Sequence, residues 1–182
     1  GGPHGPLDTI GELPQPDPAL ASEVAGELAR AGAHDELAWV RRTMECARVI
    51  LQEQDTQADP AALAQFIGHA QRPAPWLLLA FSAITRPEFV LELAATVGAE
   101  RFEKFTVDFV PAASETGRRG WSIRGLLAST AEEAPDQQKL RQAIAAVSHC
   151  TAHAPVDQRP ALLALLAWAW WMLGLQTVAE RH

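Results

Sequence analysis

The chain has 182 residues, of which 48% are hydrophobic and 20% charged, and its formal net charge is −7. That length suits one domain, whose folding buries about 70% of the unfolded surface, so neither a metal nor a disulfide is needed to hold a core. The negative charge argues against a nucleic-acid-binding protein, which needs clustered Lys and Arg.

The first sixteen residues hold four prolines and four glycines in a polar context. Such a composition does not form a packed element. We therefore predict a flexible Pro/Gly-rich leader over residues 1–16 and a single helical domain over residues 17–182.

Two Asp-Pro pairs, Asp17-Pro18 and Asp59-Pro60, have the pattern of helix starts. An Asp carboxylate accepts hydrogen bonds from the free amides of the first turn, and Pro fits the first helical position because its missing amide has no partner there. Apolar spacing of three and four residues follows each pair. The first helix is predicted to stop at Gly32 and the one after Asp59 near residue 70.

Further helices are predicted from the same apolar spacing, over residues 34–54, 76–84, 87–97, 99–109, 136–153 and 160–173, with another opening at 176. Residues 76–84 also fit a buried strand, but three leucines, two alanines and one β-branched residue favour a helix. Residues 111–125 are predicted to be a long loop, followed by a short helix. The expected fold is an all-α bundle or array of about eight to nine antiparallel helices.

The segment 160–173 is apolar on every face, which predicts a helix in the middle of the bundle. The uncharged run 161–175 has fifteen residues, fewer than the roughly 20 that cross a bilayer. We therefore expect no membrane insertion.

The C-terminal residues resemble the first hairpin of a tetratricopeptide-type unit. Ala167 and Ala179 stand at the small inter-helix positions, Trp170 at the aromatic position and Gly174 at the turn. Close helix pairing needs small residues at the crossing and a large one beside it. An ordinary antiparallel helix pair explains the same pattern, and repeat stability needs at least three stacked units.

A wider resemblance covers residues 12–182 and is carried by five segments, 13–20, 59–64, 140–147, 154–155 and 160–169. Their order is similar to the helical C-terminal part of an actinobacterial family known as domain of unknown function 4192. The resemblance implies a helical fold and an actinobacterial origin. Whole members of that family also carry an N-terminal α/β portion, and the family has no established activity, so no function is implied.

Two cysteines, Cys46 and Cys150, are too few for a disulfide scaffold or a structural zinc site, which favours a cytoplasmic location. Cys46 lies within a long amphipathic helix with no histidine beside it in the sequence. That setting is typical of a structural thiol rather than a nucleophile.

His149 and His153 lie four residues apart on one predicted helix, so both imidazoles have the spacing to face one metal ion. Cys150 is rotated about 100° from His149 by the helical period, which removes the nearest third ligand. We interpret both histidines as surface residues on a polar face, and we expect no metal and no other cofactor.

Arg118, Arg119 and Arg124 surround Trp121 in the predicted loop and form the one local basic and aromatic concentration in an acidic chain. Arginine binds carboxylates and phosphates bidentately, and tryptophan offers a flat apolar surface. These residues are therefore candidates for contact with an acidic peptide or a phosphate. The alternative is that Trp121 packs into the core and the arginines are solvated.

No catalytic constellation is evident in the sequence, so an interaction or scaffold module, forming a fragment of a longer chain, is the favoured function. We expect a strip beside Trp168, Trp171 and Met172 to be covered by a protein partner, by the remainder of its own full-length chain, by a second copy in a homo-oligomer, or by its own Pro-rich leader. The alternative is an enzyme or small-molecule-binding domain, with Trp76, Trp121 and Trp168 lining an apolar pocket between helices.

Overall fold

The computed structural model describes residues 11–30, 39–52, 59–84 and 137–174. These residues form six α-helices and one 3-10 helix: α1 (Pro18–Arg30), α2 (Trp39–Gln52), α3 (Pro60–Ala70), α4 (Pro73–Ile84), α8 (Gln137–His153), η2 (Val156–Gln158) and α9 (Arg159–Met172). The described part of the chain is helical and contains no strand. The helices predicted over 87–97 and 99–109, the loop over 111–125 and the second helix of the tetratricopeptide-like hairpin lie outside the described residues.

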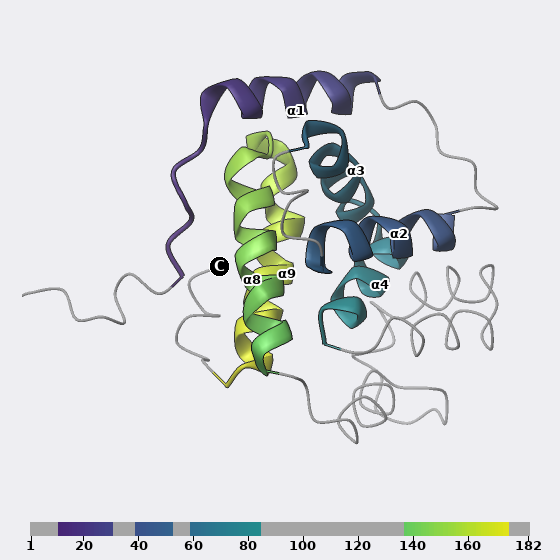
Figure 1. Ribbon diagram of the computed structural model, residues 1–182, viewed down its shortest axis with the longest axis vertical. Coiled ribbons are helices and arrows are strands. Elements are labelled where there is room, and N and C mark those ends of the chain that lie inside the picture. Colours follow the sequence, from purple (N-terminus) through teal and green to yellow (C-terminus); the bar gives the residue numbers. More distant parts are fainter. Residues whose placement is uncertain (1–10, 31–38, 53–58, 85–136, 175–182) are drawn as a thin grey trace, which may run out of the picture.

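The antiparallel pair α8 and α9 stands beside a group made of α2, α3 and α4, and α1 lies across the end of both (Figure 1). The most extensive helix pairs are α2 with α4, α1 with α3, and α8 with α9. Both α3 and α8 contact every other described α-helix. These two helices therefore form the centre of the described fold.

The core combines side chains from all six α-helices. Its largest fully buried members are Trp39, Phe66, Phe81, Ile50, Leu63, Ile67, Leu78, Leu79, Leu140, Leu162 and Leu165. Each such side chain contributes about 1.5–3 kcal/mol when it is fully buried. Leu13 packs against this core, so part of the predicted leader lies on the domain.

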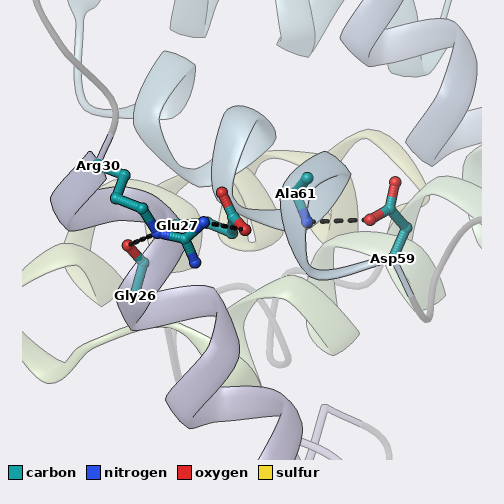
Figure 2. Close-up of polar contacts among 5 residues, drawn as sticks. All are labelled: Gly26, Glu27, Arg30, Asp59 and Ala61. Carbon is teal, nitrogen blue, oxygen red and sulfur yellow. Dashed lines mark hydrogen bonds and ion pairs between the residues drawn. The ribbon is translucent and has the colours of Figure 1, made fainter.

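The two predicted Asp-Pro helix starts are confirmed. Asp59 Oδ1 accepts a hydrogen bond from the Ala61 amide at 3.0 Å, as Figure 2 shows. Asp17 Oδ1 accepts one from the Ala19 amide at 2.9 Å. Each carboxylate satisfies one of the amides that a helix start leaves without an intrahelical partner.

The last turn of α1 is closed by Arg30, also drawn in Figure 2. Its Nε donates to the Gly26 carbonyl at 3.2 Å, and its guanidinium lies 3.0 Å from the Glu27 carboxylate. A basic residue in the last turn interacts favourably with the helix dipole.

Helix α4 begins earlier than the sequence predicts, at Pro73 rather than at Trp76. Pro73 and Pro75 both lie in the first turn, where their missing amides have no helical partner. The first amide after them, that of Trp76, donates to the Arg72 carbonyl at 2.9 Å. The two prolines therefore belong to the first turn of α4 instead of preceding it.

Helix α9 ends as predicted at Gly174, whose φ of 82° lies in the left-handed region that favours glycine.

The predicted central position of α9 is wrong. Its buried residues, Leu162, Leu165, Leu166 and Ala169, lie on one side of the helix. Apolarity on every face does not determine which faces receive neighbours, and here the opposite side contains exposed residues.

Candidate functional site

The side of α9 opposite its buried leucines is apolar along its whole length. We call Pro160, Ala164, Ala167 and Trp171 the α9 outer face, because the helical period of 100° per residue aligns these four positions. Pro160, Ala164 and Trp171 are exposed and Ala167 is half-buried. No charged side chain belongs to this face, and the indole N–H of Trp171 is its one side-chain hydrogen-bonding group.

Trp171 is the largest exposed member, with 53% of its surface accessible, whereas Trp168 and Met172 are half-buried and pack against the core. Trp168 lies three residues before Trp171, so the two occupy neighbouring positions on the helix surface. Trp171 is therefore exposed on the α9 outer face, and the half-buried Trp168 lies at the edge of that face.

Side chains from the preceding helices fix α9 in place. The indole Nε1 of Trp76 on α4 donates to the Ala161 carbonyl at 2.9 Å. Gln71 Nε2 donates to the Gln158 carbonyl at 3.0 Å, immediately before α9. Because its indole N–H is bonded to the backbone of α9, Trp76 joins two helices and does not present this polar group to a ligand.

Arg159 is the first residue of α9, but its guanidinium contacts residues that precede the helix. Its Nε donates to the Ala154 carbonyl at 3.0 Å, and a terminal guanidinium nitrogen donates to the Ala152 carbonyl at 3.3 Å. These bonds hold the guanidinium against the end of α8. The α9 outer face therefore carries no formal charge, although the cationic Arg159 is the neighbour of Pro160 in the chain.

The prediction that His153 is a surface residue is wrong, because its side chain is only 3% exposed. His153 Nδ1 lies 2.9 Å from the His149 carbonyl, and its Nε2 accepts a hydrogen bond from the Asp17 amide at 3.0 Å. A partner 136 residues away in the sequence therefore satisfies the ring inside the fold. The helical pattern around residue 153 carries no signal of this contact.

His149 is half-buried, and its ring centroid lies 4.3 Å from that of His153. Both nitrogens of His153 are engaged in hydrogen bonds, which leaves no lone pair on that ring for a metal ion. No group of three or more His, Cys, Asp or Glu suited to a metal occurs among the described residues.

Cys46 and Cys150 are free, buried thiols on α2 and α8, with exposures of 5% and 0%. Burial, and then the nearby Glu45 carboxylate, raises the pKa of Cys46 to about 12. Burial also raises the pKa of Cys150, to which the nearby Cys46 contributes. Both groups stay protonated at neutral pH, so neither is an activated nucleophile.

A buried pair that sequence reasoning missed joins α2 to α3. Thr43 Oγ1 donates to the Trp39 carbonyl at 2.8 Å and lies 3.1 Å from His69 Nδ1. Because the single hydroxyl hydrogen is used on the carbonyl, Nδ1 donates to the hydroxyl oxygen. Thr43 is 0% exposed, so this pair joins two helices and has no access to a substrate.

The candidate contact residues Arg118, Arg119, Trp121 and Arg124 lie outside the described residues. None of the described helices is both long enough and apolar enough to cross a lipid bilayer.

Comparisons with protein-family models, with curated proteins and with solved structures found no match to this chain.

Proposed function

We propose that the protein is a non-enzymatic interaction module that binds an apolar helix of a partner protein on the α9 outer face. The observation that carries the proposal is the 53% exposure of Trp171 on a helix face without a charged side chain. Large apolar side chains that remain exposed in a continuous patch commonly mark interaction surfaces.

The shape of the α9 outer face favours a helix as the partner element. Ala164 and Ala167 leave a shallow track in which the ridge of a second helix fits at close approach. Trp171 stands beside this track, and Trp168 lies at its edge. Tryptophan is enriched among the few interface residues that supply most of the binding energy.

The chemistry of the face also restricts the partner. Because the guanidinium of Arg159 is held on the carbonyls of Ala152 and Ala154, no cation of α9 faces an incoming helix. Charged side chains on the contacting side of the partner helix would lose their hydration at the α9 outer face without gaining a counter-charge. The partner stripe should therefore consist of uncharged, apolar residues.

The buried groups of the described residues support a non-enzymatic function. The two thiols and the Thr43–His69 pair are buried, and both nitrogens of His153 already have hydrogen-bond partners. We extend the proposal to a cytoplasmic module of a longer chain, similar to the helical part of domain of unknown function 4192 proteins. In that setting the partner helix belongs to another protein.

Replacing Trp171 by glutamate is expected to weaken capture of the partner at least about thirtyfold, because a central interface tryptophan contributes about 2 kcal/mol or more. Val156→Glu is the matched control, since Val156 is 77% exposed but lies on η2, off the α9 outer face. The measurement is quantitative mass spectrometry of proteins co-purified with each tagged variant from source cells. Equal recovery with both variants would contradict the proposal.

A further inference from the structure

The indole N–H of Trp171 is the one polar side-chain group on the α9 outer face. Within the described part of the chain this N–H meets no acceptor. Trp171 is 53% exposed, so water is its acceptor in the free protein. Any partner that covers the face therefore meets a hydrogen-bond donor.

Docking of a helix on the α9 outer face takes this donor out of water. Ala167 and Trp171 lie four residues apart and are neighbours on the helix surface, so a helix that packs along Ala164 and Ala167 also reaches the indole. An N–H that is buried without an acceptor weakens binding by about tenfold or more. The partner must therefore supply an acceptor at this point.

The fold itself shows how an indole is satisfied between two apolar helices. Trp76 Nε1 on α4 donates to the main-chain carbonyl of Ala161 on α9 at 2.9 Å. A backbone carbonyl has two lone pairs, so it can accept from an indole as well as from its own helical amide. The acceptor residue is an alanine, whose short side chain leaves the carbonyl accessible to a tryptophan of the neighbouring helix.

Side-chain acceptors suit the α9 outer face less well than a main-chain carbonyl. A carboxylate would lose its hydration there without a counter-charge, because the guanidinium of Arg159 is held on the carbonyls of Ala152 and Ala154. Asn, Gln, Ser and Thr accept a hydrogen bond but also carry a donor of their own. Proline, alanine and tryptophan side chains offer that donor no acceptor. A main-chain carbonyl accepts without adding a donor.

We propose that the partner helix carries a small residue, alanine or glycine, opposite Trp171, and that the main-chain carbonyl beside it accepts the Trp171 indole N–H. The contact repeats between two proteins the one that Trp76 makes between α4 and α9. This inference rests on the proposed function and adds to it the chemistry that the partner must present at one point of the α9 outer face.

The test replaces Trp171 with 3-benzothienylalanine, in which sulfur takes the place of the indole N–H and the ring size is kept. The whole tagged chain is immobilised in a dilution series and mixed with an extract of source cells. The probe is the protein that Val156→Glu still recovers and Trp171→Glu loses. Its binding should weaken about fivefold with the benzothienyl side chain, the equivalent of one hydrogen bond.

The matched control is the same replacement at Trp170, a half-buried residue outside the α9 outer face, which should change binding by less than about twofold. Unweakened binding with 3-benzothienylalanine at position 171, when Trp171→Glu abolishes binding, would overturn the hydrogen bond and leave the proposed function standing. If no protein depends on Trp171, both proposals fail. The proposal is also wrong if the partner turn crosslinked from position 171 contains neither alanine nor glycine.

Discussion

Replacing Phe66 by alanine is expected to lower the free energy of unfolding by about 3–5 kcal/mol, the cost of removing a large aromatic side chain from a packed core. Phe66 is 0% exposed and belongs to α3, which contacts every other described α-helix. The cavity would therefore open at the centre of the fold, where neighbours on several sides resist collapse. The effect is read from the midpoint and slope of guanidinium unfolding.

The matched control is Gln65→Ala, an exposed position adjacent to Phe66 on the same helix. Surface substitutions away from special features stay within about 0.5 kcal/mol. If Phe66→Ala also changed stability by less than about 1 kcal/mol, the site would not be the packed centre that the structure describes.

The two thiols are expected to react with a disulfide reagent at pH 8 about a thousandfold more slowly in the folded protein than in denaturant. The pKa of an unperturbed thiol is about 8.5, whereas burial raises the pKa of Cys46 to about 12, so the reactive thiolate is scarce. Burial raises the pKa of Cys150 in the same direction. The measurement is the rate of thiol release with and without denaturant.

The same pKa shifts give a direction for stability against pH. A thiol whose folded pKa lies above its unfolded value contributes stability below about pH 8.5 and loses it as the pH rises toward the folded pKa. Folding should therefore weaken between about pH 8.5 and 12, and Cys46→Ala should reduce that slope. Fast labelling of both thiols in the folded protein would contradict this account.

Local chemistry explains which parts of the fold were predictable. The Asp59 cap and the Gly174 stop each depend on residues within one helical turn, so a sequence pattern contains the whole interaction. The start of α4 was misjudged because Pro73 and Pro75 break a helix interior but suit a first turn. These errors and successes both concern interactions between near neighbours in the chain.

Long-range packing explains what was not predictable. The burial of His153 depends on Asp17, and the position of α9 depends on which of its faces α8 and α4 cover. An apolar helix has the same sequence whether it is enclosed or covered on one side. The exposure of Trp171 therefore became visible only once the helices were assembled.

The most direct test of the α9 outer face as a docking surface is site-specific photo-crosslinking in source cells. A photoreactive amino acid is placed at Trp171, at Ala164 on the same face, or at Ala145, an exposed position on α8. The account predicts one and the same crosslinked protein from positions 171 and 164 and none from position 145. Absence of crosslinks from both α9 positions, or an equal pattern from position 145, would contradict it.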